Sequence, residues 1–382
     1  MEFNPFLMKN NTLKKAILKI HLWLGLSSGI LVFIIAITGC LYAFQEEIQD
    51  YTDEYRFVTK QEKPFMFPSQ LEEIARKEIP NKVLHAIKYN GSLKSAEAIF
   101  FHYEPSYHYI VYLNPYTGEV LEKTNMEEGF FNFILDGHFY LWLPHEIGQT
   151  LTASATLVFL ILLITGFILW YPKNKNAAKQ RFWFKWKKGL KWKRKNYDLH
   201  NITGLYVLII ALIFAITGLV WGFQWFANSY YTILGGEKSL VYVDPISTIK
   251  TKTVEKPLDQ IWTLMQKEYP QAKSIEVHPP ESASSSIAAN ANPEEGTYWK
   301  IDYRYFDQYN LEEQKVEHIY ARYKEAKIAD KLMLLNYDIH TGAVFGIAGK
   351  IFAFLISLLI ASLPITGFYI WWGRNRKSKV KI

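Results

Sequence analysis

Two long apolar stretches of this chain repeat one another, and this repeat constrains the fold more than any other feature. The first, from His21 to Gln45, reads HLWLGLSSGILVFIIAITGCLYAFQ, and the second, from His200 to Gln224, reads HNITGLYVLIIALIFAITGLVWGFQ. They align without a gap, so the leading histidines, an Ala-Ile-Thr-Gly tetrapeptide and the final glutamines coincide. Each stretch would be about 37 Å long as an α-helix, which is enough to cross a bilayer.

Two further apolar stretches share a related signature. The tetrapeptide Ile-Thr-Gly-Phe begins at Ile164 and again at Ile365, and a tryptophan follows at Trp170 and at Trp371. The chain thus has four hydrophobic segments with a Thr-Gly pair each, arranged as helix, polar region and helix, twice. Both halves run in the same direction, which predicts two parallel repeats related by an axis along the membrane normal.

The apolar segments have the length and the flanks of membrane spans. They lie near 22–45, 148–172, 202–226 and 344–372, and each passes the length test for a transmembrane helix. Aromatic residues make up 16% of the chain, with 12 tryptophans, as is typical of membrane interfaces. Four such runs, flanked by tryptophans, tyrosines and basic clusters, argue against the buried helices of a large soluble protein.

Basic residues concentrate in three segments, 1–20, 173–198 and 374–382. Together these hold 20 of the 43 basic and 2 of the 36 acidic residues, a net charge of +18 that leaves −11 for the rest. The positive-inside rule therefore places both termini and the 173–198 loop in the cytoplasm. Nucleic-acid binding is the alternative for that loop, but its interfacial tryptophans favour a juxtamembrane segment, so we expect the lipid bilayer and no nucleic acid as its partner.

The sequence thus predicts an integral membrane α-helical bundle of four transmembrane helices with two α+β external domains. The expected segments are a cytoplasmic arm at 1–19, helices at 20–46 and 199–228, helices with their lead-ins at 138–172 and 340–373, external domains at 47–137 and 229–339, a basic cytoplasmic loop at 173–198, and a basic tail at 374–382.

Local patterns predict the elements of the external domains. In the first, Ser69 and Glu72 are spaced as a capping box at a helix start, and the apolar character of 96–103 predicts a strand. In the second, the serine- and alanine-rich stretch 282–290 indicates a flexible loop, and strands are expected at 297–303 and 305–306.

Four of the ten histidines occupy matched positions in the two halves. His21 and His200 begin helices that run outward, so both are expected on the cytoplasmic side at equal depth. His138 and His340, each preceded by Asp-x, lead into helices that run inward, so both are expected on the external side. Haem iron takes one axial ligand from each of two facing helices, and the two pairs therefore suit two bis-His b-type haems.

Other interpretations of these histidines stay open. A single interfacial histidine is more simply satisfied by water or backbone, and only the matched positions favour a haem ligand. A zinc or other transition-metal site lacks clustered cysteines or carboxylates. On the second helix, His145 is the alternate ligand to His138, because it also stands just before the apolar run.

Glycines share the helix face of two of these histidines. Gly39 follows His21 by 18 residues, or five turns, and Gly218 follows His200 by the same interval. Each glycine could leave room for the second macrocycle, or it could serve close helix packing.

These motifs together resemble those of the PepSY-associated transmembrane proteins, which include iron-regulated membrane proteins and inner-membrane ferrisiderophore reductases. The matching residues are His21-x-Trp23-x-Gly25-Leu26, Asn114-Pro115-Tyr116-Thr117-Gly118, Asp136-x-His138, His200-Asn201, Asp338-x-His340-Thr341-Gly342 and the run from Leu363 to Trp372. The resemblance implies two PepSY-like periplasmic domains, a dihaem bundle, and electron delivery to Fe(III)-siderophore with release of Fe(II). The second turn, at 307–310, departs from the pattern because it lacks Thr-Gly.

The leading hypothesis is a dihaem electron-transfer protein of the bacterial inner membrane, a haem-dependent reductase of ferric siderophores or other ferric chelates. Its electron donor could be a quinol or a cytoplasmic reductase that docks on the basic loop. The alternative is a non-enzymatic, membrane-anchored PepSY protein that binds or regulates peptidases. A transporter ranks last, because beyond Pro364 the helices show no charged or interrupted midplane segment.

Overall fold

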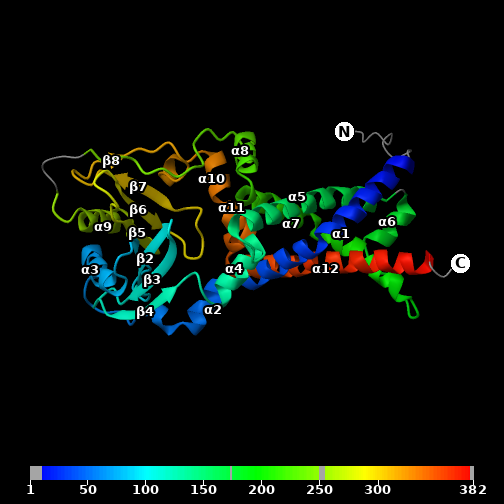
Figure 1. The fold of residues 1–382 in the computed structure, drawn as a ribbon, viewed down its shortest axis with the longest axis horizontal. Coiled ribbons are helices and arrows are strands. Elements are labelled where there is room, and N and C mark those ends of the chain that lie inside the picture. The colour runs from blue at the N-terminus through cyan, green and yellow to red at the C-terminus, as the bar shows by residue number, and fades with distance from the viewer. Residues whose placement is uncertain (1–10, 173, 249–253, 379–382) are drawn as a thin grey trace. The chain divides into compact units, whose positions relative to one another are not determined.

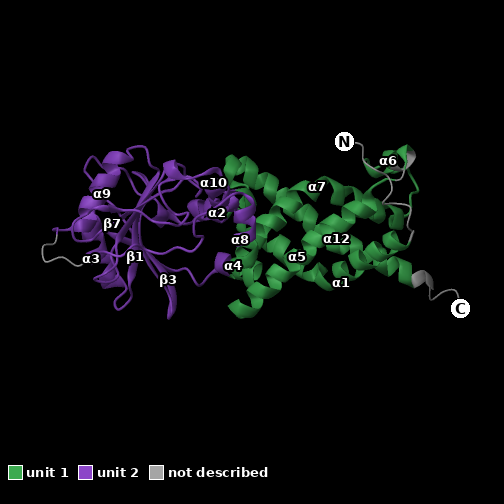
Figure 2. Ribbon diagram, turned by 90° about the horizontal axis from the view of Figure 1, so that it is seen from above, with its two compact units in different colours: residues 1–44, 133–227, 339–382 green, residues 45–132, 228–338 purple. Residues whose placement is uncertain are grey.

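The computed structural model describes residues 11–172, 174–248 and 254–378, so the ends of the expected arm and tail lie outside the described residues. Two compact units make up the chain (Figure 2). A helical unit comprises residues 1–44, 133–227 and 339–382, and a β-sheet unit comprises residues 45–132 and 228–338. Each unit is therefore assembled from segments that are distant in the sequence.

Four helices of the helical unit are long and apolar enough to cross a membrane: α1 (Asn11–Tyr42), α5 (His145–Trp170), α7 (Trp192–Gly222) and α12 (Gly346–Ser378) (Figure 1). Helix α1 packs against α5 and α12, and α7 packs against the same two helices. Consequently α1 and α7 face each other diagonally across a four-helix bundle, as do α5 and α12. The centre of the bundle is apolar, with Val32, Val207, Ala211, Ile356 and Ile360 buried together.

Two of these helices extend well beyond their apolar runs. Helix α1 begins ten residues before His21, and α7 begins eight residues before His200. The sequence placed both histidines at helix starts, whereas the structure places them inside helices. The lysines, arginines and leucines that precede them are good helix formers, so the helices continue through the basic segments.

Short helices connect the spans. They are α4 (Phe130–Tyr140) and α11 (Asn336–Thr341), which lead into α5 and α12, with η4 (Ala343–Phe345) after α11, and α6 (Lys175–Arg181) in the basic segment. The guanidinium of Arg181 donates hydrogen bonds to the carbonyls of Leu169 and Tyr171, at 3.4 and 3.3 Å. It thereby satisfies carbonyls that the end of α5 leaves without helical partners.

The β-sheet unit contains one eight-stranded antiparallel sheet in the order β4-β3-β2-β1-β5-β6-β7-β8. Its strands are β1 (Leu84–Tyr89), β2 (Ala96–Tyr103), β3 (Ser106–Leu113), β4 (Val120–Asn125), β5 (Ser274–His278), β6 (Ile287–Asn292), β7 (Asp302–Phe306) and β8 (Glu313–Gln314). The two polar regions contribute four strands each, and β1 pairs with β5 through Ile87 and Val277. Where the sequence predicts two external domains, the structure joins both regions in one unit. This pairing removes one exposed edge from each half of the sheet.

Helices α3 (Pro68–Glu78) and α9 (Pro257–Glu268) share the core of the sheet. Leu71 from α3 and Met265 from α9 are fully buried in the same cluster as Ile87 and Val277. The remaining helices of the unit are short: α2 (Gln45–Thr52), η2 (Glu54–Arg56), η3 (Tyr323–Glu325), α10 (Ile328–Leu334), and α8 (Gln224–Ile233), whose residues 224–227 belong to the helical unit.

The predicted capping box at Ser69 is wrong. Helix α3 begins at Pro68 and its N-cap is Phe67, whose backbone N–H donates to Oε1 of Gln70 at 2.9 Å. Ser69 instead donates from its backbone N–H and its hydroxyl to the carboxylate of Asp259 in α9, at 2.9 and 2.6 Å. The serine therefore joins the two helices that cover the sheet.

The predicted flexible loop at 282–290 is also wrong over its second half. Residues 287–292 form β6, and all six are buried. Alanine and asparagine have low strand propensity, but here pairing with β5 and β7 on both sides overrides it. The strands expected at 297–303 and 305–306 are a single strand, β7, which begins only at residue 302 and ends at residue 306.

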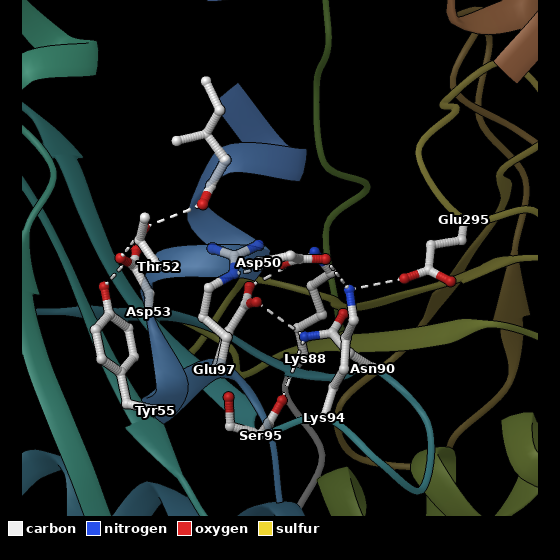
Figure 3. A network of polar contacts seen from close by, with 12 residues as sticks. Asp50, Thr52, Asp53, Tyr55, Lys88, Asn90, Lys94, Ser95, Glu97 and Glu295 are labelled. Atoms are coloured by element: carbon white, nitrogen blue, oxygen red, sulfur yellow. Dashed lines mark hydrogen bonds and ion pairs between the residues drawn. The ribbon is translucent and has the colours of Figure 1, made fainter. Parts of the chain in front are cut away.

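A network of ion pairs ties the two polar regions together (Figure 3). Lys94 Nζ lies 2.8 Å from a carboxylate oxygen of Asp50 in α2 and 2.7 Å from one of Glu295. Arg56 Nε lies 2.7 Å from the other oxygen of Asp50. Burial alone would raise the pKa of Asp50, but Lys94 and Arg56 outweigh it and hold that pKa below its ordinary value.

Candidate functional site

The structure brings His21 and His200 together across the bundle. His21 lies on α1 and His200 on the diagonally opposite α7, and their ring centres are 6.4 Å apart with the ring planes inclined by 81°. The two helices run in the same direction, so histidines at equivalent positions meet at one level. This is the pairing that their depth in the sequence predicts.

His138 and His340 form the second pair. They lie on the lead-in helices α4 and α11, and their ring centres are 6.2 Å apart with the planes inclined by 65°. The rings of Phe214 and Trp221 lie 5.7 and 5.5 Å from that of His340, so the surroundings are largely apolar. Each pair thus takes one histidine from each half of the chain.

His145 lies apart from both pairs. Its side chain is 73% exposed, and its ring stacks on Tyr140 with the centres 4.0 Å apart. Its Nε2 lies 3.8 Å from a carboxylate oxygen of Asp136. The histidine that meets His340 is therefore His138 and not the alternate.

Each paired histidine contacts a threonine of the fourfold Thr-Gly signature. The Nδ1–Oγ1 distances are 2.9 Å for His21 and Thr165, 3.3 Å for His138 and Thr38, 3.0 Å for His200 and Thr366, and 2.8 Å for His340 and Thr217. In every case the threonine belongs to the neighbouring span of the same half. Within the described residues, no hydrogen bond uses Nε2 of these four histidines, so Nε2 is the ring nitrogen left for a ligand.

The glycine after each threonine makes room for the imidazole. A Cβ added there would lie close to the histidine Cε1, at 3.1 Å for Gly39 and His138, 3.3 Å for Gly166 and His21, 3.4 Å for Gly218 and His340, and 3.2 Å for Gly367 and His200. The distances at Gly39, Gly166 and Gly367 are shorter than an ordinary carbon–carbon contact, and the distance at Gly218 is at the lower limit of one. The close neighbour of each of these glycines is thus a histidine of the same half.

Two other glycines position the lead-in helices. The carbonyl oxygen of Tyr140, two residues after His138, would lie 2.2 Å from a Cβ at Gly148. In the second half, the carbonyl oxygen of Gly342, two residues after His340, would lie 2.0 Å from a Cβ at Gly349. Only glycine lets the backbone approach so closely, and the lead-in turn therefore folds against the start of the span in both halves.

Asp338, two residues before His340, holds a loop of the β-sheet unit. Its carboxylate accepts hydrogen bonds from the backbone N–H groups of Tyr298 and Trp299, at 3.0 and 2.9 Å. Burial raises the pKa of Asp338 despite these donors. Asp136, its counterpart by sequence, has a side chain that is 37% exposed, so the matched Asp-x-His motifs differ in the role of the aspartate.

The separation within each pair fits one metal ion held between two imidazoles. With about 2 Å for each metal–nitrogen bond and roughly 1 Å from each nitrogen to its ring centre, two such imidazoles have centres roughly 6 Å apart. The observed 6.4 and 6.2 Å agree with this distance. The donor set also fits haem, because each pair offers two imidazoles from opposite sides within a bundle of apolar helices.

The remaining histidines form no comparable site. His85 and His278 lie 4.8 Å apart on the sheet, in a cavity of about 570 Å³, and burial lowers the pKa of His278. Among the described residues, no group of three or more histidines, cysteines, aspartates or glutamates could hold a metal ion. The two histidine pairs of the bundle are therefore the candidate cofactor site.

Comparison with known families bears on the whole arrangement, since it covers both halves of the bundle and the segments between them. The family model for the PepSY-associated TM region matches residues 18–374. The chain belongs to this PepSY-associated family. No curated protein matches the sequence. Membership agrees with the four candidate membrane helices, and the matched range contains all four paired histidines.

Sequence reasoning identified the histidines of this PepSY-associated chain but not the threonines that contact them. The signal was present, because Thr-Gly recurs once in every span. Depth and helical phase show which residues lie at one level, but they do not show which neighbouring helix a side chain faces. To identify the histidine that each threonine contacts, one must know that α1 packs against α5 and that α7 packs against α12.

Proposed function

We propose that this protein is a dihaem electron-transfer protein of the bacterial inner membrane that reduces a ferric chelate, such as Fe(III)-siderophore, in the periplasm and releases Fe(II). The observation that supports it most is the geometry of two histidine couples, His21 with His200 and His138 with His340, each with the spacing of two imidazoles on one metal ion. His21 and His200 would hold one b-type haem, and His138 and His340 the other. Bound haem supplies reversible one-electron chemistry, and the protein's ligands and burial tune its potential.

The bundle spaces the two couples across the membrane. His138 contacts α1 at Gly39, which follows His21 by 18 residues, about 27 Å along a helix. This distance is close to the roughly 30 Å of the hydrocarbon core, so the couples lie near opposite faces. Val32, Val207 and Ala211 are buried in the bundle and keep water out of the region between them.

Charge supports the orientation. The basic segments adjoin the ends of the spans that carry His21 and His200, and the acidic excess lies in the polar regions that form the sheet. The positive-inside rule therefore puts the termini in the cytoplasm and the β-sheet unit in the periplasm. Electrons from a quinol or from a reductase docked on the 173–198 segment would enter at the His21–His200 couple and leave at the His138–His340 couple.

The choice of a ferric chelate rests on the ferrisiderophore reductases that the motifs resemble. The test uses purified protein in liposomes with a ferric chelate outside and a reductant inside. We expect a Soret band that responds to dithionite, and Fe(II) formation that His200→Ala and His340→Ala abolish and that His145→Ala retains. A colourless protein would support the membrane-anchored peptidase-binding alternative.

A further inference from the structure

Each threonine that contacts a paired histidine donates its hydroxyl proton to a backbone carbonyl of its own helix. Each hydroxyl donates to the carbonyl four residues earlier in its helix: Thr38 to Ile34 at 2.8 Å, Thr165 to Ile161 at 2.9 Å, Thr217 to Ile213 at 2.7 Å and Thr366 to Ser362 at 2.9 Å. A hydroxyl has one proton to donate, so its remaining capacity is to accept. The hydrogen bond to each imidazole must therefore run from the histidine Nδ1–H to the threonine oxygen.

From this geometry we infer that Thr38, Thr165, Thr217 and Thr366 are positioning residues that fix the tautomer of the four histidines and tune the haems, an inference that rests on the proposed function. With the proton on Nδ1, the lone pair is on Nε2, the nitrogen that a metal takes. An acceptor at Nδ1–H also makes the imidazole a more basic ligand, which favours the ferric over the ferrous state. The threonines thus lower the reduction potential of each haem.

Back-bonding by itself does not explain the arrangement. Threonines in apolar helices commonly donate to the carbonyl four residues earlier, and Thr156 in α5 does so to Thr152 at 2.9 Å without contacting an imidazole nitrogen among the described residues. The four threonines beside glycine each meet a histidine Nδ1 at the ligand level of the bundle. Thr156 is consequently the matched control for an effect of helix packing alone.

The four contacts are not equivalent. At His138 the closer acceptor is the carbonyl of Ile35, at 2.9 Å, whereas the hydroxyl of Thr38 lies at 3.3 Å. At His340 the hydroxyl of Thr217 lies at 2.8 Å, the shortest of the four contacts. The structure therefore assigns Thr38 the smallest share and Thr217 the largest.

At the other three histidines, a backbone carbonyl is a second acceptor beside the threonine hydroxyl. Backbone carbonyls three residues before the threonine also interact with the imidazoles: Leu162 with His21, Leu363 with His200, and Phe214 with His340. When a threonine hydroxyl is lost, the backbone carbonyl remains as a weaker acceptor for the histidine Nδ1–H. Valine variants should therefore retain haem in an altered state.

The experiment compares valine and serine at each position in the full-length protein, with redox titration and low-temperature electron paramagnetic resonance of the ferric haems. Thr217→Val should raise the midpoint potential of one haem, alter its low-spin signal, and release that haem about tenfold faster. Thr217→Ser, which keeps the hydroxyl, should restore all three properties. Thr38→Val should shift the same haem less, and Thr156→Val should change nothing.

Several results would overturn the inference. One is a Thr217→Val protein with wild-type potential and signal, and another is a serine variant that shifts as far as valine. A Thr38→Val effect equal to that of Thr217→Val would contradict the ranking based on the two Nδ1–Oγ1 distances. If Thr217→Val does not fold, Thr217→Ser and the valine and serine variants of Thr38 still test the inference. Wild-type protein without haem would instead refute the proposed function.

Discussion

Gly39 has only a hydrogen atom at the position where the methyl group of an alanine would contact His138. An added Cβ would lie 3.1 Å from Cε1 of that histidine, the shortest of the four such approaches. Gly39→Ala should therefore displace the ring of His138 and reduce the haem content to about one per chain. Pyridine haemochrome assay of the purified variant measures this content.

Gly25→Ala is the matched control on the same helix. Its Cβ would lie 3.8 Å from Leu162, an ordinary contact distance, so two haems per chain should remain. Equal haem content in the two variants would contradict the role assigned to Gly39.

The two candidate ligands near α5, His138 and His145, can be distinguished by substitution. His138→Ala should remove the haem that His340→Ala removes, whereas His145→Ala should keep both, because the ring of His145 is largely exposed and stacked on Tyr140. Haem content and the absorption spectrum of the three variants provide the measurement. A protein that loses haem with His145→Ala and keeps it with His138→Ala would reverse the assignment.

The histidine pairs show how far residue patterns reach. Depth along two parallel repeats was enough to predict that His21 meets His200 and that His138 meets His340, because equal position in equal helices means equal level. Which ring nitrogen is occupied could not be predicted, since it depends on the side-by-side packing of α1 with α5 and of α7 with α12.

Among the elements, α2 is joined to the second polar region through Lys94. Lys94→Gln should weaken the attachment of α2 and of the 293–297 loop, and lower their hydrogen-exchange protection two- to fivefold, about 0.5–1 kcal/mol for partly exposed ion pairs. The exposed i,i+4 pair of Lys77 and Glu73 offers the control, and Lys77→Gln should leave protection unchanged.

The same network sets a pH dependence. The folded state lowers the pKa of Asp50, so the stabilisation is present above its ordinary value of about 4 and disappears as the pH falls through the lowered value. The difference in protection between wild type and Lys94→Gln should therefore be full at pH 7 and vanish in strong acid. A difference that persists in strong acid would show that the ion pair is not its source.

Local patterns predicted some elements and missed others for identifiable reasons. The expected strand at 96–103 coincides with β2, whose residues alternate between buried and partly exposed up to Phe101. Strand β6 was missed because its alanines and asparagines favour a loop, and only its neighbours on both sides make it a strand. The pairing of β1 with β5 joins residues almost 190 positions apart, which no local pattern encodes.

For the whole molecule, the charge distribution predicts opposite compartments for the basic segment and the sheet. Reporter fusions at Asn176, in α6, and at Lys94, in the β-sheet unit, should report the cytoplasm and the periplasm respectively. Activity of a cytoplasmic and a periplasmic reporter at each site measures this. The same compartment at both sites would refute the proposed topology.

The proposed function requires the bundle to hold two haems, each between one histidine of either half. The most direct measurement is haem per chain in wild type and in His21→Ala, His200→Ala and His340→Ala, with the redox spectrum of whichever haem remains. We predict two haems in wild type and one in each variant, with the same haem remaining in His21→Ala and His200→Ala and the other remaining in His340→Ala. Wild type with fewer than two haems, or His21→Ala and His340→Ala retaining the same haem, would contradict the account, because one iron cannot bridge couples about 27 Å apart.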